Sequence, residues 1–153
     1  MKIKFAIIGF GHIGRKHYNT LLGNAEAEVV AICDPYLEEE SIDGIPVFKD
    51  IEQMLISMPQ IDVVNICTPN GLHAEQSIIC INHGKHVVVE KPMSLTKKDA
   101  ENVIFHALNK HVKIFCVMQN RYTANAQFLK HLIVNNQLGN IKEVVVNLFW
   151  NRD

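Results

Sequence analysis

Short, mostly apolar runs alternate along this chain with longer segments in which apolar residues recur every three or four positions. The first run, residues 3–8, is too short and too apolar for a surface helix and is typical of a strand buried on both faces. Further strands are expected at residues 28–33, 46–48, 61–67, 86–89 and 113–117. The alternation predicts an α/β fold: a doubly wound parallel sheet whose right-handed crossovers cover both faces.

The segments between these runs have the periodicity of amphipathic helices. The first helix is expected to bury one face, formed by Ile13, His17, Leu21 and Leu22. Asp50 and Gln53 resemble a capping box at the start of the second helix. A third helix is expected at about residues 72–82. A fourth begins at Thr96, and its apolar face is expected to contain Ala100, Val103, Ile104, Ala107 and Leu108.

A glycine-rich turn follows the first strand directly. Gly9, Gly11 and Gly14 have the G-x-G-x-x-G spacing of a dinucleotide-binding turn. The first glycine allows the tight turn, the second lets a pyrophosphate approach the backbone, and the third lets helix and strand pack closely. The free N–H groups of His12 and Ile13 at the helix start are expected to face the phosphates. An ordinary strand-to-helix turn is the alternative interpretation.

The second strand ends in Asp34, about twenty residues beyond the last glycine. At this distance a dinucleotide-binding unit places the carboxylate that binds the adenosine ribose hydroxyls. Pro35 and Tyr36 offer no positive charge to a 2′-phosphate, so the sequence favours NAD over NADP. The alternative is that Asp34 is only a turn residue at a strand end.

Composition excludes several other classes of protein. The 153 residues have a formal net charge of −1 with both signs interspersed, so no nucleic-acid or membrane partner is expected. No apolar run approaches the roughly 20 residues that span a bilayer, and no signal peptide is expected. The four cysteines lack C-x-x-C spacing and are interpreted as small buried side chains in a reducing, cytoplasmic setting. The scattered histidines suggest no metal site.

Polar residues follow the carboxyl ends of several predicted strands, at positions 34, 68–73, 90–92 and 119–121. In an open α/β sheet, ligands bind at that edge. The pattern changes afterwards, because residues 121–136 are typical of a helix and residues 142–150 of a long apolar strand ending at Trp150. Such a strand is expected to pair with its copy in a second molecule or with a sheet edge. We therefore expect a dinucleotide-binding domain at residues 1–120, and at 121–153 the lead-in helix and first strand of a truncated second, α+β domain.

Three motifs occur in a fixed order along the chain: Gly9-x-Gly11-x-x-Gly14, Thr68-Pro69-Asn70-x-x-His73 and Glu90-Lys91-Pro92. In combination they resemble the glucose-fructose oxidoreductase / inositol dehydrogenase (Gfo/Idh/MocA) family over essentially the whole chain. The resemblance implies a Rossmann NAD(P)-binding fold, a homo-oligomer, and a large second domain that binds the substrate. Because that domain is incomplete here, the chain alone is expected to be inactive.

The resemblance also implies roles for individual residues. Thr68, Asn70, His73 and Gln119 would line the cofactor, and Glu90 would hold the nicotinamide ribose. The implied catalytic residue is Lys91, which would lie beside both cofactor and substrate and accept or relay a proton. The Lys91-Pro92 bond is often cis in such proteins. Asn120 and Arg121 would contact the substrate.

Within the family, Gln119-Asn120-Arg121 and the ending Val-x-Leu-Phe-Trp-Asn-Arg resemble the bacterial UDP-N-acetylglucosaminuronate 3-dehydrogenases. The implied activity is NAD-dependent oxidation of a secondary hydroxyl of a sugar nucleotide, at C3, in surface polysaccharide biosynthesis. Alternatives are a family dehydrogenase of another sugar or an inositol, a non-catalytic NAD-sensing module and, least favoured, a methyltransferase. Taken singly, Lys91 and Glu90 could be a solvated ion pair. His73 could be a residue at a helix start whose ring hydrogen-bonds only to backbone groups.

Overall fold

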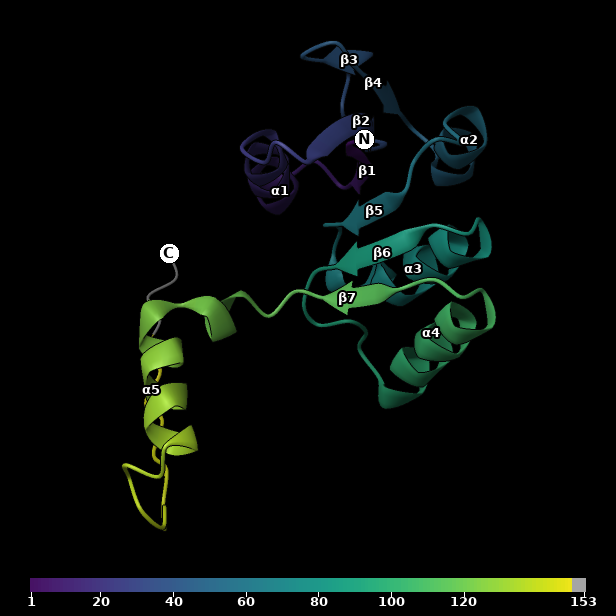
Figure 1. Ribbon diagram of the computed structural model, residues 1–153. Helices are drawn as coiled ribbons and strands as arrows, with labels where there is room; N and C mark the ends of the chain where they lie inside the picture. Colours follow the sequence, from purple (N-terminus) through teal and green to yellow (C-terminus); the bar gives the residue numbers. More distant parts are fainter. Residues whose placement is uncertain (150–153) are drawn as a thin grey trace. The chain divides into compact units, whose positions relative to one another are not determined.

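A computed structural model describes residues 1–149 of the chain. Its main feature is a seven-stranded sheet with the order β3-β4-β2-β1-β5-β6-β7 (Figure 1). The chain divides into two compact units, Met1–Val117 and a second that begins at Met118, and each is described by itself. The sheet belongs to the first unit.

The sheet is parallel except at one edge, where two short strands pair antiparallel. The strands are β1 (Ile3–Ile8), β2 (Ala27–Cys33), β3 (Ser41–Ile42), β4 (Ile45–Phe48), β5 (Val63–Ile66), β6 (His86–Val89) and β7 (Ile114–Cys116). From β1 the chain builds outward through β2 to β4, then returns to place β5 on the other side of β1. The order of the strands therefore reverses between β1 and β5, where an open α/β sheet binds its ligands.

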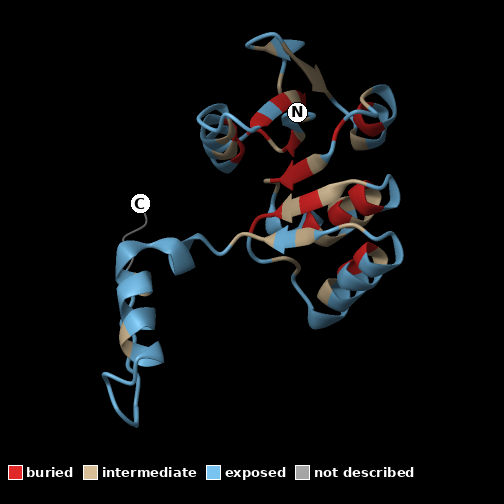
Figure 2. Ribbon diagram, in the orientation of Figure 1, coloured by how far each residue is buried: buried red, intermediate tan, exposed pale blue. Residues whose placement is uncertain are grey.

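Helices cover both faces of the sheet (Figure 1). They are α1 (His12–Leu22), α2 (Ile51–Ser57), α3 (His73–Asn82) and α4 (Lys97–Asn109), with a 3-10 turn η1 (Asn70–Leu72) before α3. On one face α1 packs over a small apolar cluster of Ile7, Phe10, Tyr18, Val29 and Ile32. On the other face α2, α3 and α4 cover a larger cluster. Figure 2 shows the buried residues gathered on the central strands and on the inner sides of the helices. The doubly wound α/β prediction is confirmed.

The helix starts follow the predicted chemistry, but two of the predicted buried faces are partly wrong. The Asp50 carboxylate accepts from the backbone N–H of Gln53, and the Thr96 hydroxyl accepts from that of Asp99, so both caps form. The residues of α1 that are buried are Gly14 and Tyr18. The apolar residues that instead lie exposed on α1 and α4 are Ile13, Leu22, Ile104 and Leu108.

The second unit contains a 3-10 turn η2 (Gln119–Tyr122) and a helix α5 (Ala124–Val134). The helix prediction for this segment is confirmed, although the helix is shorter than expected. The strand expected at 142–150 is not formed over residues 142–149, and Trp150 lies outside the described residues. A strand needs a partner to satisfy its backbone groups, and the second unit contains no other strand over its described residues, 118–149. The division into domains at residue 120 stays a prediction.

Candidate functional site

The turn from β1 into α1 depends on two glycines that approach other backbone closely. Gly9 has a φ of 82°, a left-handed conformation that glycine adopts without strain. A Cβ at Gly14 would overlap the carbonyl oxygen of Gly9. Gly11 differs, because no atom lies within 4 Å of the place where its Cβ would be. The space beside Gly11 is therefore open to a ligand.

The N-terminus of α1 has no side-chain cap, unlike those of α2 and α4. Its first backbone N–H groups, including those of His12 and Ile13, therefore receive no hydrogen bond acceptor from a capping side chain. Both residues are exposed. An uncapped helix start next to an open glycine is suited to bind an anion such as a pyrophosphate.

Asp34, at the end of β2, connects two loops of this edge. Its Oδ2 accepts from the backbone N–H of Phe10 at 2.7 Å, and its Oδ1 accepts from that of Tyr36 at 2.9 Å. The carboxylate is half-buried, and each oxygen keeps acceptor capacity for a further donor. Asp34 can thus accept hydroxyl groups of a ribose while it holds the glycine turn in place.

A pocket of about 450 Å³ lies between these loops and the end of β5. Its lining includes Gly9, Gly11, Asp34, Tyr36, Lys49, Thr68 and Gln76. Two of these residues carry no sequence signal that links them to the site. Lys49 brings a cation to the lining, and Gln76 accepts a hydrogen bond from the Thr68 hydroxyl at 2.6 Å. Asn70 lies exposed at the start of η1.

His73 has a different place from the one expected. Its side chain is fully buried rather than lining a ligand pocket. Its Nε2 lies 2.8 Å from the carbonyl oxygen of Thr68, and its Nδ1 lies 2.7 Å from that of Pro92. The ring therefore joins the loop after β5 to the loop after β6. The structure supports a bracing role for His73 instead of direct contact with a cofactor.

His73→Leu is expected to destabilise the chain by about 1–3 kcal/mol, because the buried carbonyl oxygen that accepts from the ring N–H loses its donor. Urea unfolding monitored by circular dichroism measures this change. His106→Gln is the matched control, since the side-chain hydrogen bond that His106 makes within residues 1–149 is an exposed one with Asn82, and the substitution should change stability by less than about 0.5 kcal/mol. Equal effects of the two substitutions would contradict the bracing role.

Glu90 and Lys91 follow β6 and differ sharply in exposure. Glu90 is 9% exposed, whereas Lys91 is exposed. Glu90 Oε1 lies 3.1 Å from His17 Nε2, and Glu90 Oε2 accepts from the backbone N–H of Lys91 at 3.2 Å. Within residues 1–149 no side chain pairs with the Lys91 ammonium, so Glu90 and Lys91 do not form a mutual ion pair. The Lys91–Pro92 peptide bond is cis, as expected.

The cysteines near this edge are unreactive thiols. Burial raises the pKa of Cys67 to about 12, with a further contribution from the negative charge of Glu90. Burial likewise raises the pKa of Cys33 to about 12, helped by Asp50 and Asp34. Nucleophilic or redox chemistry requires the thiolate, which such a pKa suppresses at neutral pH. The interpretation of the cysteines as small buried side chains is right for Cys33 and Cys80, whereas Cys67 and Cys116 are half-buried.

The remaining predicted site residues belong to the second unit. Gln119, Asn120 and Arg121 lie exposed in η2. Their assignment to cofactor and substrate stays a prediction. None of the helices within residues 1–149 is long and apolar enough to cross a membrane. The same residues contain no cluster of three or more His, Cys, Asp or Glu side chains that could hold a metal ion.

A doubly wound sheet, a glycine turn into an uncapped helix and an aspartate at the end of the second strand define a dinucleotide-binding domain. Residues 3–118 match the family described as "Oxidoreductase family, NAD-binding Rossmann fold". The chain belongs to this family, the Gfo/Idh/MocA oxidoreductases. The predicted family and its NAD cofactor are thereby confirmed.

Known relatives are dehydrogenases of several substrates. D-glucoside 3-dehydrogenase of Escherichia coli K12 is 29% identical over 145 residues, which are 91% of this chain and 41% of the relative. Myo-inositol 2-dehydrogenase of Thermotoga maritima is 30% identical over 142 residues, 90% of this chain and 42% of the relative. The WlbA dehydrogenase of Bordetella pertussis, solved with NADH and UDP-GlcNAcA, has a TM-score of 0.85 and 33% identity over 91% of this chain and 44% of that one. The chain thus spans less than half the length of these relatives.

Proposed function

We propose that this chain is the NAD-binding part of a dehydrogenase that oxidises a secondary hydroxyl of a sugar nucleotide. The proposed substrate is UDP-N-acetylglucosaminuronate, which would be oxidised at C3. The observation that carries the proposal is the ammonium of Lys91, which is exposed and has no ion-pair partner within residues 1–149, at the sheet edge that also holds Asp34 and the glycine turn. The relatives solved with NADH and UDP-GlcNAcA support this substrate class. Glucoside and inositol dehydrogenases among the relatives make other polyols the main alternative substrates.

The residues present fit the dinucleotide. The uncapped N-terminus of α1 and the open space at Gly11 would hold the pyrophosphate, and Asp34 would accept the adenosine ribose hydroxyls. Glu90 would orient the second ribose. When bound, the nicotinamide accepts the hydride.

Lys91 would act on the substrate as a general base. Loss of a hydride from the carbinol carbon would make the hydroxyl proton acidic, and Lys91 in its neutral amine form, at hydrogen-bond distance, could take that proton in the same step and become an ammonium. Two lysines of this edge, Lys91 and Lys49, have no ion-pair partner within residues 1–149. Lys49 lines the pocket beside Asp34, whereas Lys91 follows β6 next to Glu90, on the side proposed for the nicotinamide half. An acid or imidazole from a complete substrate domain would then share the proton with it.

Calorimetric titration of NAD, NADH and NADPH tests the cofactor half directly. Asp34→Ala is expected to weaken NADH binding by about 1 kcal/mol or more, because the ribose loses an acceptor. Asp62→Ala is the matched control, since Asp62 Oδ2 also accepts from a backbone N–H, that of Lys4 at 2.8 Å, but lies at the amino end of β5. It should bind NADH like the wild type.

Three outcomes of this titration bear on the proposal. Failure of the folded wild-type chain to bind any dinucleotide would remove its main support. Equal binding of NADPH and NADH would mean that Lys49, which lines the pocket, serves a 2′-phosphate. A change of oligomeric state that distinguishes NADH from NAD would favour a sensing module over a dehydrogenase.

A further inference from the structure

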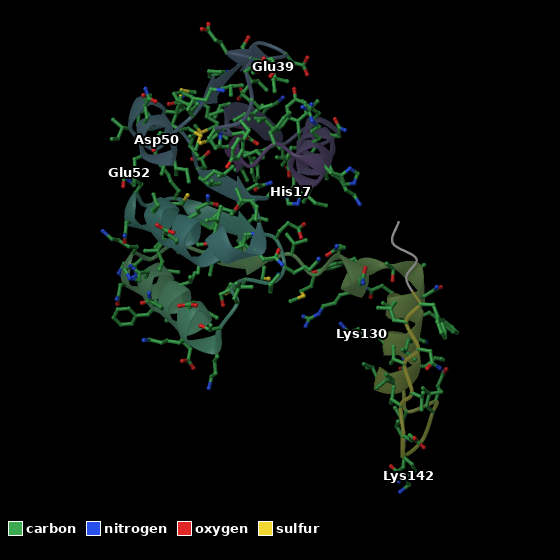
Figure 3. The ribbon with its side chains drawn as sticks, turned by 180° about the vertical axis from the view of Figure 1, so that it is seen from behind. His17, Glu39, Asp50, Glu52, Lys130 and Lys142 are labelled. Atoms are coloured by element: carbon green, nitrogen blue, oxygen red, sulfur yellow. The ribbon has the colours of Figure 1, made fainter. Side chains whose placement is uncertain are left out.

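A buried polar chain connects three elements behind the candidate site. His17 extends from α1 toward β5 (Figure 3), where the side-chain amide nitrogen of Asn65 lies 3.0 Å from its Nδ1. The other ring nitrogen, Nε2, lies 3.1 Å from Glu90 Oε1 at the end of β6. The three side chains are largely shielded from water, with His17 15% exposed and Asn65 4% exposed. Of the three residues, Glu90 alone is proposed above to contact the cofactor, at the second ribose.

The partners determine where the ring proton lies. A carboxylate only accepts hydrogen bonds, so His17 Nε2 must carry a proton to bond with Glu90. Nδ1 is then free to accept from the amide of Asn65. Asn65 is the one polar residue of β5, and its Oδ1 is buried with no hydrogen-bond partner among residues 1–149. A buried unpaired oxygen is unfavourable, so packing alone does not explain an asparagine at this position.

Glu90 and its turn are held from both faces of the sheet. His17 on α1 binds the Glu90 side chain, whereas His73 on α3 binds the carbonyl oxygen of Pro92. Lys91 lies between these two anchored residues and has its own side chain in solvent. A carboxylate fixed in this way presents its remaining lone pairs in one direction.

We propose that His17 is a positioning residue, which orients Glu90 toward the nicotinamide half of the cofactor, with Asn65 fixing the tautomer of the ring. The inference rests on the proposed function, because it requires that Glu90 meets the nicotinamide ribose. The competing explanation is that the network only ties α1 to the sheet.

The two explanations differ in which part of the ligand responds. NADH contains the nicotinamide riboside, whereas ADP contains only the half that would occupy the Asp34 pocket. His17→Leu removes the donor to Glu90 and is expected to raise the Kd for NADH about tenfold, while the Kd for ADP stays within about twofold. His17→Gln supplies an amide donor and is expected to recover part of the NADH affinity.

Tyr18→Phe is the matched control on the same helix. It removes the 2.8 Å hydrogen bond from the Tyr18 hydroxyl to Asp43, a tertiary contact of α1 that does not touch Glu90. If loosening of α1 explained the effect, Tyr18→Phe would weaken NADH binding like His17→Leu. We expect it to leave the ratio of the two Kd values unchanged.

Nitrogen-15 NMR of the His17 ring in the wild-type chain gives a result that does not depend on folding of a variant. The spectrum should show a protonated Nε2 and should shift when NADH is added but not when ADP is added. A proton on Nδ1 alone, or equal losses of NADH and ADP affinity in His17→Leu, would overturn the inference and leave the proposed function standing. A wild-type chain that binds ADP but not NADH would overturn both.

Discussion

Gly14→Ala is expected to destabilise the chain by about 3 kcal/mol or more, because the added methyl group would overlap the carbonyl oxygen of Gly9. The obstructing atom belongs to the backbone, so no side-chain rotation relieves the clash. Helix α1 would have to move away from the end of β1. Urea unfolding monitored by circular dichroism measures the loss, and a change below about 1 kcal/mol would contradict the close approach of helix and turn.

Gly11→Ala is the matched control for this prediction. A Cβ at Gly11 would meet no atom within 4 Å, and its φ of −71° suits alanine. Stability should therefore stay within about 0.5 kcal/mol of the wild type. The methyl group would instead fill space that the pyrophosphate approaches, so NADH binding should weaken at least about tenfold. Gly14 is therefore needed for the fold, whereas Gly11 is needed for the ligand.

Lys91→Met is expected to lower turnover by about 10²–10⁴-fold in an enzyme that carries this chain together with a complete substrate domain. The thioether cannot accept the hydroxyl proton, whereas the Lys91 amine can. Binding of NADH should remain within about twofold, because the Lys91 side chain extends into solvent and contributes no contact to the pocket beside Asp34. Steady-state kinetics with the sugar nucleotide and calorimetry with NADH measure the two effects separately.

Two further substitutions make the interpretation of Lys91 specific. Lys91→Arg keeps the positive charge but cannot give up its proton near neutral pH, so it should lose activity like Lys91→Met. Retained activity in Lys91→Arg would mean that the residue acts only through its charge. Lys97→Met, which removes an exposed lysine paired with Glu101 at the start of α4, should leave turnover unchanged.

The main strands could be predicted because each is a short, mostly apolar run with at most one polar residue, such as Lys4 in β1 or Asn65 in β5. Helix faces were harder, because α1 buries Tyr18 and leaves Ile13 and Leu22 exposed. A tyrosine with a polar tip does not stand out in an apolar pattern, although here its hydroxyl is satisfied by Asp43. The two-residue strand β3 is too short to have any periodicity.

The candidate site was predictable where its chemistry is local in sequence. The glycine spacing and Asp34 identify the cofactor edge without knowledge of the sheet order. The contacts of His17 were not predictable, because Asn65 and Glu90 lie 48 and 73 residues away along the chain. His73 was assigned to the cofactor for the same reason, since only the fold shows that a backbone carbonyl oxygen lies within hydrogen-bond distance of each of its ring nitrogens.

The two backbone hydrogen bonds of Asp34 have a thermodynamic consequence. A carboxylate that is free to rotate loses conformational entropy when a ligand orders it, at a cost of about 0.5–1.5 kcal/mol for a rotamer-rich side chain. Asp34 is already ordered by Phe10 and Tyr36 before any ribose arrives. Part of the entropy cost of recognition is therefore borne by folding, and the pocket is pre-organised for its ligand.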